Sequence, residues 1–138
     1  TLRALAGLGV FVLVRTSNPD SDTVQSHPLA DGRTVATMMA DHVATLGATR
    51  LGECGLSNVG AVVGATKSAE AAALRRRMPR QVFLVPGYGA QGGTAEDIRA
   101  MVRPDTRAPG TSGILVTASR SIMYNYPAGS SWAKGIRL

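Results

Sequence analysis

Four short apolar runs alternate with helical patterns, and this alternation constrains the fold more than any other feature. The runs span residues 9–14, 59–65, 81–86 and 113–119. Continuous apolar, β-branched segments of this length are typical of strands buried on both faces of a parallel sheet. Because a helical segment follows each run, the chain predicts the order β-α-β-α-β-α-β-α with right-handed crossovers.

The helical segments are recognised by their spacing and capping residues. Apolar side chains, with His42 among them, recur at helical spacing and predict an amphipathic helix over residues 32–46 that ends at Gly47. Thr66 and Ser68 offer N-caps to a second helix over residues 69–77. Two more segments complete the pattern, namely a helix capped by Thr94 and Asp97 over residues 94–102 and a last helix beyond Pro127.

Two architectures fit this order, an open doubly wound sheet and part of a (β/α)8 barrel. A complete barrel typically needs about 250 residues, and four units in 138 residues are close to half of one. Barrels often hold phosphate in the loops after strands 7 and 8. If the third and fourth runs are those strands, residues 1–138 form a single domain with about four C-terminal βα units, and the N-terminal half is absent.

Composition excludes several classes of protein. The chain is 44% hydrophobic and 17% charged, as expected of one globular domain. Its longest nearly apolar run, residues 4–14, is too short to span a bilayer, and no signal peptide is recognisable. We therefore expect a cytoplasmic protein without a membrane partner. A single cysteine, Cys54, and the distant His27 and His42 predict neither a disulfide nor a metal site.

The net charge of +6 is compatible with two kinds of partner. Nucleic acid is one, but the chain has six aromatic residues, and its basic residues are scattered apart from a cluster at residues 75–77. That cluster falls at a predicted helix C-terminus, where cations are favoured in any case. A positive field that attracts a phosphorylated small molecule fits equally well, and no nucleic-acid partner is expected.

The segment Phe83–Gly93 joins a strand to a helix start through a loop with four glycines. Glycine lets the backbone approach a ligand closely, and the first N–H groups of a helix favour an anion. Gln91 lies within the loop, where its amide could reach a ligand. The pattern indicates a phosphate site, with a simple glycine-rich turn as the alternative.

Four motifs in fixed order resemble one protein family. They are Val14–Pro19 (VRTSNP), Gly60–Thr66 (GAVVGAT), Phe83–Gly93 (FLVPGYGAQGG) and Ala118–Ile122 (ASRSI). Together they resemble the C-terminal half of orotidine 5′-phosphate decarboxylase in its bacterial type 2 form. The resemblance extends from about Gly9 to Tyr126. It implies a (β/α)8 barrel, a homodimer, and conversion of orotidine 5′-monophosphate to uridine 5′-monophosphate and carbon dioxide without metal or organic cofactor.

The resemblance also implies roles for individual residues. Ser17 matches a serine that hydrogen-bonds the pyrimidine, and Gln91 a glutamine that spans from base to phosphate. Arg120 matches the arginine that pairs with the phosphate, beside the backbone N–H of Ser119, and Pro86 shapes the pocket floor. Possible pocket-wall residues are Thr16, Asn18, Tyr88 and Gly89. Taken alone, Ser17 could cap a turn, and Arg120 could form a surface salt bridge.

The reacting groups of that family do not have counterparts in this sequence. Family members carry a lysine between aspartates in a D-x-K-x-x-D pattern, and neither Lys67 nor Lys134 lies in such a pattern. The resemblance therefore assigns no catalytic residue to this chain, and we expect the isolated chain to be inactive. A half-barrel binding or assembly module and a related phosphosugar enzyme, such as a hexulose-phosphate synthase, are alternatives, but Ser17–Pro19 and Gln91 favour the nucleotide.

Overall fold

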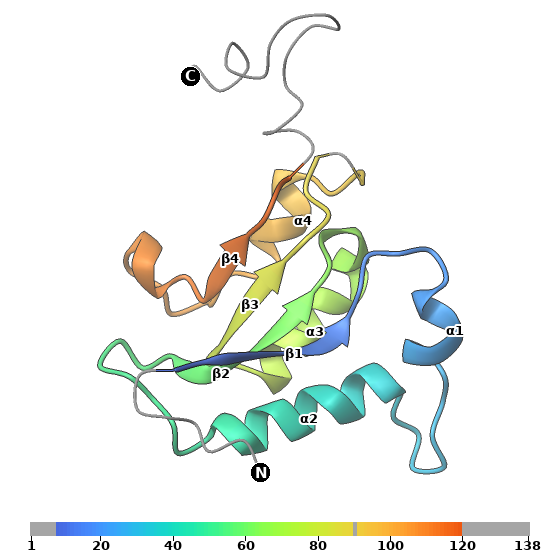
Figure 1. The fold of residues 1–138 in the computed structure, drawn as a ribbon, viewed down its shortest axis with the longest axis horizontal. Helices are drawn as coiled ribbons and strands as arrows, with labels where there is room; N and C mark the ends of the chain where they lie inside the picture. The colour runs from blue at the N-terminus through green and yellow to red at the C-terminus, as the bar shows by residue number, and fades with distance from the viewer. Residues whose placement is uncertain (1–7, 90, 120–138) are drawn as a thin grey trace, which may run out of the picture.

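A four-stranded parallel sheet organises this computed structural model, which describes residues 8–89 and 91–119 (Figure 1). The strands are β1 (Val10–Arg15), β2 (Ser57–Val63), β3 (Gln81–Val85) and β4 (Ile114–Val116). They are hydrogen-bonded in the order β1-β2-β3-β4, and every neighbouring pair is parallel. A doubly wound sheet reverses its strand order at a switch point. The unbroken sequential order is instead that of a (β/α)8 barrel.

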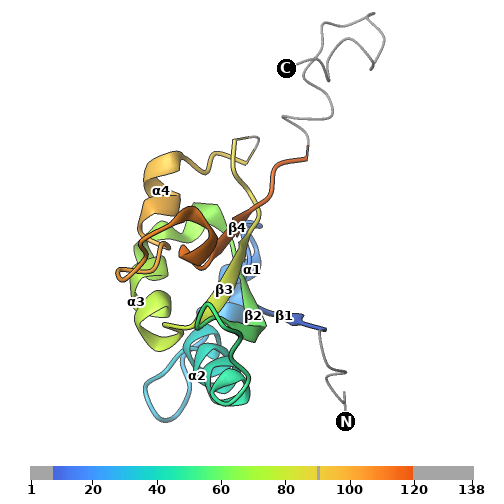
Figure 2. The ribbon, with the colours of Figure 1, turned by 90° about the vertical axis from the view of Figure 1, so that its left-hand side faces the viewer.

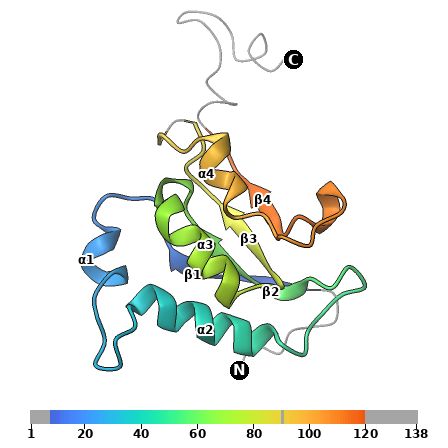
Figure 3. The same cartoon turned by 180° about the vertical axis from the view of Figure 1, so that it is seen from behind.

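Three helices cover one face of this sheet. They are α2 (Val35–Gly47), α3 (Ser68–Arg77) and α4 (Ala95–Arg99), and Figures 2 and 3 show them on the same side of the strands. A short helix, α1 (Ser21–Gln25), follows β1, and two 3-10 turns lie at η1 (Ala65–Lys67) and η2 (Pro109–Thr111). Among the described residues, no helix has the length and hydropathy needed to cross a bilayer.

Local capping explains where two of these helices begin. Thr34 caps α2 and Thr94 caps α4, each through a reciprocal pair of hydrogen bonds with the residue three positions later. The predicted pairing of Thr94 with Asp97 is thus confirmed, although α4 ends at Arg99 rather than at residue 102. The predicted helix beyond Pro127 lies outside the described residues.

Two expectations about the loops are wrong. The residue before α3 is Lys67, which makes no side-chain cap, so neither Thr66 nor Ser68 is the N-cap. The Thr66 hydroxyl instead donates to the Ser17 carbonyl at 3.2 Å. The first helix after β1 is not the one predicted over residues 32–46, because the shorter α1 forms before it. Five residues are too few to show helical periodicity in a sequence.

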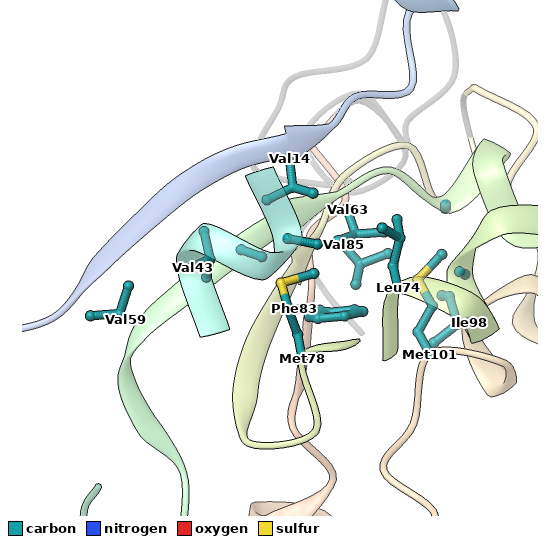
Figure 4. Packing of buried hydrophobic residues seen from close by; sticks show 14 residues of the cluster. Val14, Val43, Val59, Val63, Leu74, Met78, Phe83, Val85, Ile98 and Met101 are labelled. Carbon is teal, nitrogen blue, oxygen red and sulfur yellow. The ribbon is translucent and has the colours of Figure 1, made fainter. Parts of the chain in front are cut away.

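The hydrophobic core lies between the sheet and these helices (Figure 4). Alternate strand residues point into it, among them Val63 and Phe83, and they pack with side chains such as Leu74, Met78 and Met101. Burial of this apolar surface is the main stabilising contribution to such a fold.

The opposite face of the sheet is apolar, and no element within residues 8–89 and 91–119 covers it, which differs from the expectation of strands buried on both faces. Register aligns Leu13, Val62, Leu84 and Leu115 in one row across the four strands. Leu13 is 57% exposed and Leu115 is 51% exposed. In a closed barrel this face is the interior, filled by layers of branched apolar side chains. The apolar pattern of the strands therefore fits a barrel, whereas the described helices cover only one face of the sheet.

Arg75 is part of the core although it belongs to the predicted basic cluster at the end of α3. Its guanidinium donates to four backbone carbonyls, those of Met78, Gln81, Met101 and Gly113, at 2.8–3.0 Å. It also lies over the Phe83 ring, 3.6 Å from the centroid. Arg75 thereby joins α3 to the amino ends of β3 and β4. The general preference for cations at a helix C-terminus does not account for this buried position.

Candidate functional site

The site lies where the carboxyl ends of β1, β3 and β4 meet. Parallel strands end at one edge, so the loops after them lie together even when they are distant in sequence. Ser17 follows β1 and Gln91 follows β3, and the Ser17 hydroxyl donates to Gln91 Oε1 at 2.5 Å across 74 residues. The structure thus joins the two side chains that the resemblance assigns to the pyrimidine.

Gly87 makes this contact possible. Its φ is +96°, a conformation that side chains rarely adopt. A Cβ on Gly87 would also stand 3.1 Å from Ser17 Cβ and 3.2 Å from Gln91 Oε1. Any larger residue would therefore strain the backbone and crowd both polar side chains.

A small hollow of about 100 Å³ lies beside Gln91. It is lined by Pro86, Gly87, Tyr88, Gln91, Thr117, Ala118 and Ser119. Three of the residues assigned to substrate binding, Pro86, Gln91 and Ser119, therefore share one cavity, and Tyr88 contributes to its wall. A whole small-molecule site usually measures about 300–1,000 Å³, so this hollow has room for only part of a nucleotide.

Three N–H groups of the glycine loop are bonded within the loop itself. Within it, the N–H groups of Gly89, Gly92 and Gly93 donate to loop carbonyls at 2.8–3.1 Å. The Thr94 N–H at the start of α4 donates to the Asp97 carboxylate at 2.8 Å. These four donors are thus engaged, and the turn serves to present the Gln91 side chain.

The loop after β1 is held from several directions. The Thr16 N–H donates to Gln25 Oε1 at 2.9 Å, and the Ser21 hydroxyl donates to the Thr16 carbonyl at 3.2 Å. The Thr16 hydroxyl donates to Asn18 Oδ1 at 2.6 Å. The hydroxyl of Ser17 bonds to Gln91 and not to the turn, so it does not act as a turn cap.

Within the described part of the chain, four of the predicted residues do not line the hollow, namely Thr16, Ser17, Asn18 and Gly89. Thr16 and Asn18 bond to each other in the β1 loop, and Gly89 belongs to the glycine loop. Arg120, the predicted phosphate partner, lies outside the described residues, and so does Lys134. The convergence of Gln91 and Arg120 on one phosphate therefore stays a prediction.

An ion-pair cluster supports this edge of the sheet. Arg15, the last residue of β1, is 1% exposed and pairs with Glu70 at 2.9 Å and with Asp22. Lys67 also pairs with Asp22, at 3.0 Å. Hydrogen bonds from Arg15 and then Lys67 lower the pKa of Asp22 to about 2. The cluster ties α1 and α3 to the end of β1.

Sequence reasoning missed this cluster, because the first predicted strand, residues 9–14, leaves Arg15 in the segment that follows it. Its partners Asp22 and Glu70 follow 7 and 55 residues later, and no spacing rule joins them. One signal was available, since Arg15 directly continues an apolar run. A charge in that position is either at the strand end or paired.

Within the described residues, no three His, Cys, Asp or Glu side chains are grouped so that they could hold a metal ion. Cys54 is exposed and unpaired. The polar groups that gather at the carboxyl edge are hydroxyl, amide and guanidinium groups, together with the carboxylates that pair with Arg15.

Comparison with known proteins identifies the group to which this site belongs. Residues 1–133 match the model of the orotidine 5′-phosphate decarboxylase / HUMPS family. The chain belongs to this family. Its parallel α/β sheet is accordingly of the (β/α)8 type expected from the sequence motifs.

Individual relatives extend this result. The orotidine 5′-phosphate decarboxylase of Clostridium perfringens is 42% identical over 120 residues, which cover 87% of this chain and 40% of the relative. That of Rhodopirellula baltica is 42% identical over 116 residues, covering 84% and 36%. The structure of Leishmania donovani OMP decarboxylase matches with a TM-score of 0.58 and 35% identity, covering 83% of this chain and 40% of that one. The chain spans about 40% of the length of the curated relatives it matches.

Proposed function

We propose that this chain supplies the pyrimidine- and phosphate-binding half of an orotidine 5′-phosphate decarboxylase. The observation that carries the proposal is the contact between Ser17 and Gln91 beside the hollow at the carboxyl edge. Membership of the family, with relatives named as that decarboxylase, supports the same function. The ligands are orotidine 5′-monophosphate and its product uridine 5′-monophosphate.

The chemistry of the two side chains suits a uracil edge. Gln91 accepts the Ser17 proton at Oε1, which leaves two N–H donors on Nε2. Those donors can bond a base carbonyl or a phosphate oxygen, and the Ser17 hydroxyl oxygen can still accept from a ring N–H. Together the pair offers the donors and acceptors that a pyrimidine presents along one edge.

Arg120 is the proposed partner of the phosphate, with Ser119 beside it. A guanidinium offers fixed, bidentate donors to a phosphate dianion. Binding of this non-reacting group can stabilise a closed, water-poor site, so that its energy lowers the barrier at the reacting carbon. Pro86 is the proposed floor of the pocket, and Thr16, Asn18, Tyr88 and Gly89 are its proposed wall.

The proposal assigns no reacting group to this chain. Neither lysine lies in a D-x-K-x-x-D pattern, and Lys67 is paired with Asp22. We therefore propose that the isolated chain binds the nucleotide but does not decarboxylate it. Loss of orotidylate absorbance at the rate of a complete enzyme would contradict this assignment. A cytoplasmic location and a homodimeric assembly are parts of the same proposal.

Calorimetric titration with uridine 5′-monophosphate tests the binding role. We expect Arg120→Ala to weaken binding by about 2–4 kcal/mol, because a charge-assisted phosphate contact is lost. Gln91→Ala should cost less, about 1 kcal/mol, because it removes neutral hydrogen bonds. Arg80→Ala is the matched control for lost positive charge, since Arg80 is exposed before β3. Equal affinity for the parent chain and the Arg120 variant would refute the phosphate role.

One observation favours a second function, a half-barrel assembly module. The apolar row on the open sheet face includes the exposed Leu13 and Leu115, and exposed apolar surface of this kind is typical of interaction sites. Such a module would pair with another chain or with a copy of itself. Both functions allow dimers, so calorimetric titration distinguishes them, because an assembly module does not bind uridine 5′-monophosphate.

A further inference from the structure

The side chains around Thr16 carry an inference that deepens the proposed function and rests on it. Thr16 directly precedes Ser17, and both of its backbone polar groups are bonded by side chains from α1. Its N–H donates to Gln25 Oε1 at 2.9 Å, and its carbonyl accepts from the Ser21 hydroxyl at 3.2 Å. The peptide that leads into Ser17 is therefore fixed by two residues of one short helix.

A single nitrogen of Arg15 connects those two residues. Its Nη1 donates to Ser21 Oγ at 3.1 Å and to Gln25 Oε1 at 3.2 Å. The other side of the guanidinium is held by Glu70, which accepts from Nε at 3.1 Å and from Nη2 at 2.9 Å. Because Glu70 lies in the first turn of α3, a continuous set of hydrogen bonds joins that helix to the Ser17 loop.

The far side of the Ser17 loop is also fixed. The Ser17 carbonyl accepts from the Thr66 hydroxyl at 3.2 Å. A Cβ on Gly64 would stand 2.6 Å from the Ser17 nitrogen, so the chain after β2 packs tightly against this loop. Because these contacts hold Ser17 from one side, the position of its hydroxyl group depends on how firmly the hydrogen bonds to Thr16 hold the preceding peptide.

We propose that Arg15 is a positioning residue. Through Ser21 and Gln25 it holds the Ser17 hydroxyl in the place where it reads the base, and so it sets the preference for a uracil nucleotide over a base-free phosphosugar. Arg15 itself is buried and does not line the hollow. We expect Arg15 to affect binding of the base rather than of the phosphate. Ser17 contacts the amide of Gln91 that is proposed to bind the base, whereas the proposed phosphate-binding residues follow β4. Small displacements of such groups cost affinity or rate steeply.

The test replaces Gln25, because loss of Arg15 would also remove its ion pairs with Asp22 and Glu70 and so change more than the contacts of Thr16. Affinities for uridine 5′-monophosphate and for ribose 5-phosphate are measured by calorimetry, and their ratio is the base preference. In Gln25→Leu we expect this ratio to fall about tenfold, the size of one lost hydrogen bond. Affinity for ribose 5-phosphate should stay unchanged.

Gln81→Leu is the matched control. It makes the same chemical change in a buried glutamine at the opposite end of the sheet, at the start of β3. Its melting temperature can change, but its base preference should equal that of the parent chain. An equal loss of preference in both variants would show a general effect of reduced stability and would overturn the proposal.

Arg15→Lys tests the guanidinium itself. Lysine keeps the positive charge but lacks the fixed fork that reaches two acceptors at once. We expect this variant to lose base preference as well. Because Arg15 acts through Gln25, combining it with Gln25→Leu should lower the ratio little further. Fully additive losses would overturn the proposed relay.

A measurement without ligand separates failure of this inference from failure of the proposed function. Amide hydrogen exchange at Thr16 should become faster in Gln25→Leu, while exchange in β2 stays unchanged. Unchanged exchange at Thr16 overturns the positioning role. A parent chain without preference for uridine 5′-monophosphate overturns the proposed function and the specificity with it. A preference that persists in Gln25→Leu overturns only this inference.

Discussion

Two buried arginines at opposite ends of the sheet solve the problem of burying a cation in different ways. Arg15 is 1% exposed at the carboxyl end of β1 and is surrounded by side chains, including the carboxylates of Asp22 and Glu70. Arg75 is 4% exposed near the amino ends of β3 and β4. It is surrounded by four backbone carbonyls and an aromatic ring.

The two environments shift the pKa values in opposite directions. Burial disfavours the charge of Arg15, but hydrogen bonds to Glu70 and Asp22 outweigh this cost and raise its pKa. Burial, with the nearby charge of Arg103, lowers the pKa of Arg75 to about 10. Even so, Arg75 remains a cation at any physiological pH.

The difference separates a structural clamp from a functional support. Backbone carbonyls cannot move without moving their strands, so Arg75 belongs to the rigid core. Side-chain partners can be replaced one at a time without moving a strand. Two partners of Arg15, Ser21 and Gln25, also bond to Thr16 in the loop that carries Ser17. The carboxyl edge thus combines a buried charge with adjustable partners.

The largest expected effect comes from removal of the clamp. Arg75→Met removes a buried donor from four backbone carbonyls, of which that of Gly113 keeps the Phe83 N–H, so we expect the free energy of unfolding to fall by about 3–5 kcal/mol. Urea denaturation measures it. Arg76→Met is the control, because Arg76 lies next to Arg75 in the chain but is exposed. This variant should change stability by less than about 0.5 kcal/mol. Similar losses in both variants would mean that Arg75 contributes no more than a surface charge.

A smaller loss is expected at the other end of the sheet. Arg15→Met removes the Arg15 partner of Glu70 and leaves Asp22 paired with Lys67, and both carboxylates are exposed enough to be hydrated, so we expect a loss of about 2–3 kcal/mol. Arg33→Met is matched, because Arg33 also pairs with two carboxylates, those of Asp31 and Asp41, but is 38% exposed. It should cost only about 0–1 kcal/mol. If Arg15→Met proved the more damaging of the two buried-arginine variants, the comparison above would be reversed.

The smallest expected effect is a local loss of stability around Asp22 at acid pH. The folded-state pKa of Asp22 is about 2, below its ordinary value of 3.8. Its contribution is therefore fully present above pH 3.8 and is lost as the pH falls through about 2. Arg75 makes no direct bond to a carboxylate. Amide exchange between pH 4 and pH 2, corrected for the intrinsic rate, should thus show earlier loss of protection in α1 than in β3. Simultaneous loss in both would count against local control by Asp22.

Much of the fold follows from local sequence. Three of the strands lie within about two residues of the apolar runs, because burial between layers selects such runs wherever they occur. The cap of α4 was recognisable because Thr94 and Asp97 are three residues apart. The fourth strand is shorter than expected, at Ile114–Val116. The cap of α3 and the existence of α1 were missed for lack of a decisive local signal.

The candidate site was only partly accessible. The glycine loop pointed to Gln91, and the family resemblance assigned Ser17 and Gln91 separately to the nucleotide. Their contact with each other was not predicted, since no pattern rule links residues 74 positions apart. The engaged amides of Gly89, Gly92 and Gly93 could not be foreseen either, because the loop bonds to itself only in its folded shape. Arg120 stays a prediction outside the described residues.

The sequence by itself determined the alternation of strands and helices, the loops that end them and the family, because these depend on neighbours in the chain. Only the tertiary structure decided which charges are buried and what they hold. Arg15 meets Glu70 across 55 residues, and Arg75 meets the Gly113 carbonyl across 38. Whether a cation can leave water depends on partners that folding brings together, and distance along the chain does not reveal them.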